Sequence, residues 1–163
     1  MHLNNEIKII GSIILVSVFI LGGAIFLLPK TEGRSEDKKV AEDQVISKSG
    51  LHWHPKLSIF IKGQKQELEE DIGLEAIHEP IHTHKEDYKN GVVHMEMNGV
   101  VTKDETKLGN FFKIWGREFN STQIFDEKNS EEGKVKMTVN GKENKSFENY
   151  LMKDGDLIEI RYE

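Results

Sequence analysis

Six of the seven histidines of this chain lie between residues 52 and 94, with a spacing that could build a metal site. Three short motifs each place two ligand-type side chains two residues apart: His52 with His54, His82 with His84, and His94 with Glu96. Successive side chains of a β-strand alternate between its two faces, so both members of each pair point the same way. Imidazoles and a carboxylate on one sheet face could close on a divalent ion, with Zn–N bonds of about 2.0–2.1 Å.

Two of these pairs are expected to face each other across a hairpin. The polar segment that separates them ends in Asn90-Gly91, a dipeptide typical of tight turns. A chain that folds back there pairs His84 with His94 and His82 with Glu96. Directly opposed residues of an antiparallel pair have Cβ atoms about 4.5–5.5 Å apart, which is close enough for a shared ion.

The predicted site is therefore a centre for a divalent transition metal, and it has the following expected ligands: His82, His84 and His94 as primary ligands, His52 and His54 completing or flanking the site, and Glu96 or His78 as a fourth or outer ligand. The chain has no cysteine, which excludes disulfides and thiolate sites. Nitrogen and oxygen ligands favour zinc or copper as the metal. Two alternatives stay open, a histidine patch that binds no metal and a metal-free catalytic site.

Three functions are compatible with this cluster. The favoured one is a non-enzymatic module that senses, buffers or delivers a transition metal. The second is a metal-dependent hydrolase or lyase with three histidine ligands, a bound water, and Glu96 or Glu86 as general base. The third is a metal-free surface interaction module whose histidines respond to pH. The net charge of −6, without a basic stripe, indicates no nucleic-acid partner.

An apolar run over residues 9–28 contains no charge and predicts a membrane helix. About 20 apolar residues span a hydrocarbon core of roughly 30 Å, whereas the apolar part of a signal peptide is shorter, so a retained anchor is favoured. The expected organisation is a membrane anchor over 1–29, a charged flexible linker over 30–50 and a folded domain over 51–163. Basic residues after the run favour a cytoplasmic domain. An N-terminal single anchor most often exports the domain attached to it, so we expect an extracytoplasmic domain at the cell membrane.

The folded domain is expected to be α+β, with mostly antiparallel strands and one main packed helix. Apolar and polar residues alternate over 51–62, which predicts one half-buried strand with its histidines on the polar face. Apolar residues recur with helical spacing over 106–116, with Thr102 or Thr106 as N-cap and Gly116 as the stop. Further strands are expected at 66–68, 119–125, 134–139 and 157–162.

The end of the chain resembles the closing half of β-grasp domains. The resemblance is carried by Val139-Asn140-Gly141-Lys142, by Phe147 and Tyr150, and by an Asp-Gly-Asp turn within 151–160. Small sulfur-carrier proteins and the C-terminal domain of transcobalamin-like proteins end similarly. The resemblance implies a β-grasp-like fold. It does not imply sulfur transfer, which requires a C-terminal Gly-Gly where this chain ends Arg161-Tyr162-Glu163.

Residues 51–163 also resemble a family of single-anchor prokaryotic proteins with no assigned activity. The matching motifs are His52-Trp53-His54-Pro55, the run 80–84, the run 93–96 and the run 108–116. The resemblance implies the anchored architecture. Members of the resembled family often carry another histidine where this chain has Lys56. They also tend to have an acidic residue directly after the His-Thr-His motif, where this chain has Lys85. Glu86 and Asp87 are the candidates to replace that acidic residue.

Overall fold

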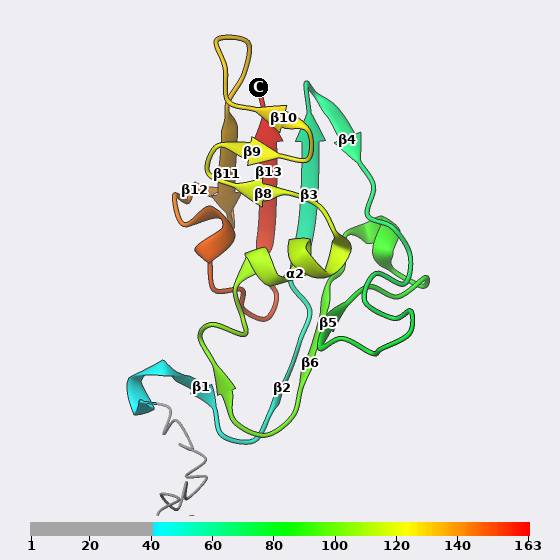
Figure 1. Cartoon of the computed structure of the whole chain (residues 1–163), viewed down its shortest axis with the longest axis vertical. Helices are drawn as coiled ribbons and strands as arrows, with labels where there is room; N and C mark the ends of the chain where they lie inside the picture. The colour runs from blue at the N-terminus through cyan, green and yellow to red at the C-terminus, as the bar shows by residue number, and fades with distance from the viewer. Residues whose placement is uncertain (1–40) are drawn as a thin grey trace, which may run out of the picture. The chain divides into compact units, whose positions relative to one another are not determined.

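The computed structural model describes residues 41–163 (Figure 1). The apolar run 9–28, and with it the predicted anchor, lies outside these residues, as do residues 30–40 of the expected linker. Within the described part of the chain, no helix has the length and apolar character needed to cross a membrane.

The larger sheet has five strands in the order β12-β11-β13-β3-β4. Its strands are β3 (Lys56–Ile61), β4 (Gln64–Gln66), β11 (Val135–Val139), β12 (Lys142–Glu143) and β13 (Leu157–Tyr162). The central pair of β13 and β3 is parallel and the other pairs are antiparallel. Alternate residues of β13, namely Ile158, Ile160 and Tyr162, are buried, as the alternation in the sequence predicts.

A second, three-stranded antiparallel sheet has the order β2-β6-β5 and carries the histidine motifs. It consists of β2 (Leu51–Trp53), β5 (Ile81–His82) and β6 (His94–Met97). The prediction of one strand over 51–62 is therefore wrong, because β2 ends before Pro55 and β3 belongs to the other sheet. Proline has no N–H for a ladder, so the chain leaves one sheet there and enters the next.

The helix α2 (Leu108–Trp115) is the one α-helix among the described residues, and it buries Leu108, Phe111 and Phe112. Gly116 ends it in the left-handed region at φ 70°, as predicted. The predicted threonine cap is wrong. The capping residue is Lys107, which makes no side-chain bond to the helix, and the backbone N–H of Leu108 donates to the Tyr150 carbonyl instead.

The remaining strands form two small sheets. β1 (Val45–Ser47) pairs with β7 (Val101–Thr102), so the folded part begins before residue 51, where the linker was expected to end. The expected strand over 119–125 is split by a turn into β8 (Phe119–Asn120) and β9 (Gln123–Ile124), which continue into β10 (Glu127–Lys128). Three short 3-10 helices complete the described residues 41–163: η1 (Glu42–Gln44), η2 (Tyr88–Asn90) and η3 (Phe147–Asn149).

One hydrophobic core joins both main sheets to the helix. Ile81 and Met95 of the smaller sheet, Ile59 and Ile160 of the larger sheet, and Phe111 of α2 all belong to it and are at most 1% exposed. The described part is thus α+β, β-rich and mostly antiparallel, as expected. The core holds the smaller sheet from behind, so its opposite face is free to carry polar side chains.

Candidate metal centre

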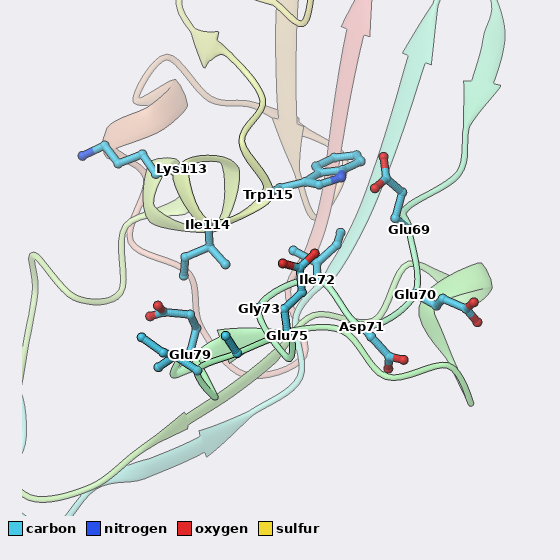
Figure 2. A pocket seen from close by; sticks show the side chains of 12 residues that line it. Glu69, Glu70, Asp71, Ile72, Gly73, Glu75, Glu79, Lys113, Ile114 and Trp115 are labelled. Carbon is cyan, nitrogen blue, oxygen red and sulfur yellow. The ribbon is translucent and has the colours of Figure 1, made fainter.

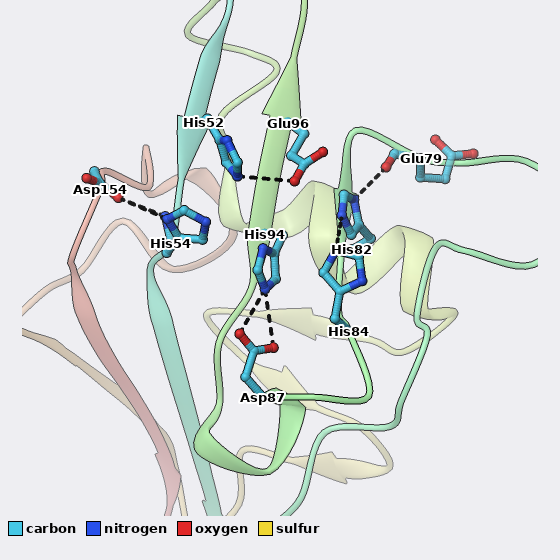
Figure 3. Close-up of polar contacts among 9 residues, drawn as sticks. All are labelled: His52, His54, Glu79, His82, His84, Asp87, His94, Glu96 and Asp154. Atoms are coloured by element: carbon cyan, nitrogen blue, oxygen red, sulfur yellow. Dashed lines mark hydrogen bonds and ion pairs between the residues drawn. The ribbon is translucent and has the colours of Figure 1, made fainter.

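The smaller sheet turns its histidines to one face because their positions alternate with core residues. Trp53, Ile81 and Met95 pack on or into the core. The residues next to each of them along its strand project to the opposite face. The result is the histidine face, made of His52 and His54 with β2, His94 and Glu96 on β6, His82 on β5, and His84 and His78 beside β5. Figure 3 shows all of these side chains except His78.

The register of the histidine hairpin differs from the predicted one by two residues. His82, and not His84, lies opposite His94, and Glu96 is paired with His52 of β2. The connection is longer than a two-residue turn, because η2 and the left-handed Gly91 fill the space between β5 and β6. A shift of two residues preserves the parity of every side chain, so the histidines still share one face.

The six imidazole rings form a nearly continuous array. Neighbouring ring centroids are 4.5–4.9 Å apart along the path from His52 through His54, His94, His84 and His82 to His78. The rings of His82 and His94, which are paired across the strands, stack at 5.7 Å.

Outer partners fix which ring nitrogen of two histidines is available. Nδ1 of His82 lies 2.9 Å from the carbonyl oxygen of Glu79 and donates to it, which leaves the lone pair of the ring on Nε2, 3.2 Å from Nε2 of His84. Nε2 of His94 donates to Asp87, whose carboxylate oxygens are 3.0 and 3.2 Å away, which leaves Nδ1. Histidines that bind metals usually donate their other ring N–H to a carbonyl or carboxylate in this manner.

The turn that contains Asp154, far along the chain, positions His54. The backbone N–H of His54 donates to Oδ1 of Asp154 at 2.8 Å, and Nδ1 of the ring lies 3.9 Å from the same oxygen. The turn is held by the buried carboxylate of Asp156, which accepts three hydrogen bonds, from the Tyr150 hydroxyl, the Asn140 amide and the Lys153 backbone N–H. Burial and the hydrogen bond to Asp156 raise the pKa of the Tyr150 hydroxyl, so this hydroxyl keeps the proton that it donates.

Two pairs of ligand-type atoms already lie at the separation expected around one metal ion. Nε2 of His82 is 3.2 Å from Nε2 of His84, and Nε2 of His52 is 3.1 Å from Oε1 of Glu96. For bonds of about 2.0–2.1 Å, two ligands of a tetrahedral ion are about 3.3–3.4 Å apart. Neither pair therefore needs to move far to share an ion.

Three groups of three residues bring one ligand atom each within 4.8 Å of one another: His52, His54 and His94; His78, His82 and Glu96; and His84, His94 and Glu96. Every predicted ligand belongs to at least one group. The predicted primary set of His82, His84 and His94 is not itself a group: His84 and His94 share the third group, His94 also belongs to the first, and His82 belongs only to the second. Glu86, the other candidate base, is exposed and belongs to none of the groups among the described residues.

His82 is the most buried member of the histidine face, with 0% of its surface exposed. Burial lowers its pKa below the ordinary value of 6.5, and the positive charges that His84 and His78 would carry lower it further. The hydrogen bond to the Glu79 carbonyl and the charge of Glu96 oppose this shift. The net result keeps the ring neutral near pH 7, which is the form that binds metals.

The residues predicted from the sequence are the ones that the structure brings together, but most of their hydrogen-bond partners were missed. Asp87 was named only as a replacement for an acidic residue of the resembled family, and the Glu79 carbonyl and Asp154 were not named for the site. Asp154 lies 100 residues from His54 along the chain, so no local pattern links them. Lys56 is exposed and does not take part in the three groups.

An open hollow of about 560 Å³ lies beside the histidine face and is lined by acidic residues and by α2 (Figure 2). Glu69, Glu70, Asp71 and Glu75 line it together with Trp115. None of the six clustered histidines lines this hollow. Glu79 lines the hollow and its carbonyl accepts a hydrogen bond from His82, but no member of the histidine face lines the hollow, so the two surfaces are separate.

Comparisons of this chain with protein-family models, with curated proteins and with solved structures find no match. The chemistry of the histidine face must therefore be argued from its own residues.

Proposed function

We propose that this protein binds a divalent transition metal ion, zinc or copper, through the histidine face. The observation that carries the proposal is the convergence of ligand atoms from six histidines and Glu96 into groups whose members lie within 4.8 Å of one another. Two ligands of a tetrahedral ion lie about 3.3–3.4 Å apart, so a pair of atoms at the 4.8 Å limit closes on the ion by approaching about 1.4–1.5 Å.

The outer hydrogen bonds support a metal site over a bare histidine patch. An exposed patch has no need for partners that hold ring nitrogens in a defined protonation state. Here the Glu79 carbonyl and Asp87 each accept a hydrogen bond from one nitrogen of a ring, so the lone pair of that ring is on the other nitrogen. This arrangement orients metal ligands and raises their basicity.

The exposure of the site favours sensing, buffering or delivery of the ion. The side chain of His78 is exposed, whereas His82, which belongs to the same ligand group, is fully buried. An ion can therefore approach from solvent through the exposed ligand and be held by the buried one. A site with this gradient suits an ion that enters and leaves.

A metal-dependent hydrolase or lyase is the second candidate. Each group supplies three ligands, which would leave one position of a tetrahedral ion for water. Glu96 belongs to two of the groups, so a Glu96 that binds the ion is not free to act as general base. Turnover of ester or phosphoester substrates by the zinc-loaded protein, lost on chelation, would favour this candidate.

We also propose a β-grasp-like topology for the larger sheet and a membrane anchor for the chain. The strand order β4-β3-β13-β11-β12, with its parallel central pair and with α2 between the two halves of the sheet in the chain, supports a β-grasp-like topology. Attachment to the cell membrane through residues 9–28, with the histidine face outside the cytoplasm, stays a prediction from the sequence. We propose that the anchor holds the site at the membrane surface.

Elemental analysis of the full-length chain tests the proposal. The protein would be purified without a nickel column, and the bound metal would be measured before and after dialysis against EDTA and reconstitution with zinc or copper. We expect bound zinc or copper that EDTA removes and reconstitution restores. A protein that takes up neither metal stoichiometrically would contradict the proposal and favour the metal-free interaction module.

A further inference from the structure

Two of the three ligand groups have no residue in common. His52, His54 and His94 form one group over β2 and β6, and His78, His82 and Glu96 form the other over β6 and β5. Together the two groups hold six ligand-type side chains, two more than a tetrahedral ion accepts. The histidine face thus has more ligands than one ion can accept.

Glu96 lies between the two groups. Its Oε1 is 3.1 Å from Nε2 of His52, a member of the first group, while the carboxylate belongs to the second group with His78 and His82. It also belongs to the third group, with His84 and His94. A carboxylate has two oxygens and can bind two ions at once, so Glu96 is in position to bridge them (Figure 3).

The charges near the array suit more than one cation. Asp87 contacts His94, and Asp154 contacts His54, so two carboxylates besides Glu96 border the rings. Negative charge at this range offsets the mutual repulsion of two divalent ions. Two-metal sites in proteins hold their ions about 3.5–4 Å apart, which is comparable with the spacing of adjacent strands.

From these observations we infer that the histidine face binds two divalent transition metal ions that share Glu96. The first ion is held by His52, His54 and His94, and the second by His78 and His82, with Glu96 between them. His84, whose Nε2 is 3.2 Å from that of His82, offers the second ion a further ligand. The inference rests on the proposed function and adds the number of ions and their arrangement.

Native mass spectrometry of the metal-free, full-length chain titrated with zinc measures the stoichiometry. We expect two ions bound at saturation. His52→Ala and His78→Ala each remove one exposed side chain that belongs to one group only, and each variant should bind one ion. His2→Ala, which removes the histidine outside residues 52–94, is the matched control and should still bind two.

The failure of this inference is distinct from failure of the proposed function. Wild-type protein that saturates with one ion would overturn the two-ion inference and leave metal binding in place. Protein that binds no ion would overturn both. Two ions retained in either His52→Ala or His78→Ala would overturn the assignment of the groups, and so would loss of both ions from either variant.

Electron paramagnetic resonance of the copper-loaded protein tests the sharing of Glu96. Two Cu²⁺ ions bridged by one carboxylate should give a dipole-coupled spectrum with a half-field transition. Glu96→Gln, which keeps the shape and removes the charge, should abolish that coupling and weaken the second binding step at least tenfold. Glu159→Gln on β13 is the matched control and should leave the spectrum unchanged. Two uncoupled Cu²⁺ signals in the wild-type protein would overturn the bridge.

Discussion

Replacing Asp87 with alanine should weaken metal binding although Asp87 belongs to none of the three ligand groups. The carboxylate oxygens of Asp87 lie 3.0 and 3.2 Å from Nε2 of His94, and the two side chains are 30% and 13% exposed. Without this acceptor the imidazole can rotate or take the other tautomer, and Nδ1 is then no longer held ready for the ion.

The expected size of the effect depends on the position of Asp87 behind a ligand. Loss of an outer hydrogen-bond partner typically costs 10–100-fold in metal affinity. Because Asp87 is partly exposed and water can replace it, we expect the lower part of that range, about 10–30-fold, or about 1.4–2 kcal/mol. Asp87→Asn keeps one acceptor oxygen and should lose less than Asp87→Ala.

Competition with a chromogenic chelator at neutral pH measures the affinity of the full-length chain for zinc. Asp126→Ala makes the same change of charge at an exposed position between β9 and β10, and should leave the affinity unchanged. Thermal melting in EDTA establishes that both variants are folded. Equal affinity of Asp87→Ala and wild type would refute the assignment of His94 as an oriented ligand. An equal loss in Asp126→Ala would reduce the effect to general electrostatics.

Three further predictions concern stability. Free zinc at 100 times its dissociation constant should raise the free energy of unfolding by about 2.7 kcal/mol, and melting that is insensitive to EDTA would contradict this. Because burial lowers the pKa of His82 below 6.5, the unfolded state binds a proton at this residue more readily than the folded state does. The metal-free protein should therefore lose stability as the pH falls below 6.5. Urea titrations at several pH values should show a weaker pH dependence of stability in His82→Gln. Gly91→Ala should lower the melting temperature much more than Gly99→Ala: both glycines have positive φ, but only at Gly91 would the new Cβ clash with a backbone atom, the Leu57 carbonyl oxygen, and equal melting temperatures would refute the clash.

The side-chain parity of the histidine motifs could be predicted from the sequence because it is a local property of the backbone. In an extended chain, residues two apart share a face whatever strand lies beside them. For that reason the predicted ligands all reach one face, even though the hairpin register was wrong by two residues. The helix could be predicted for a similar reason, since its apolar residues recur with its own period.

The strand break at Pro55 could not be read from alternation. The apolar residues Trp53 and Leu57 have the same parity on both sides of the proline, so the pattern continues while the chain changes sheets. What separates them is pairing with distant partners: β2 pairs with β6, and β3 pairs with β13, which lies about 100 residues later in the chain. A break of this kind depends on how the core packs and not on local preference.

The sequence therefore determines which residue types are candidate ligands, and local backbone geometry determines which face of a strand each of them occupies. Their grouping is a matter of long-range pairing. His52 meets Glu96 because β2 pairs with β6, and His54 meets Asp154 across 100 residues of chain. Strand register and the position of each chain reversal depend on a balance between the entropic cost of closing loops and the free energy gained by burying the shared core. Neither of these two free energies can be calculated from a short stretch of residues. The division of the histidines into separate groups, on which the two-ion inference depends, exists only in the folded molecule.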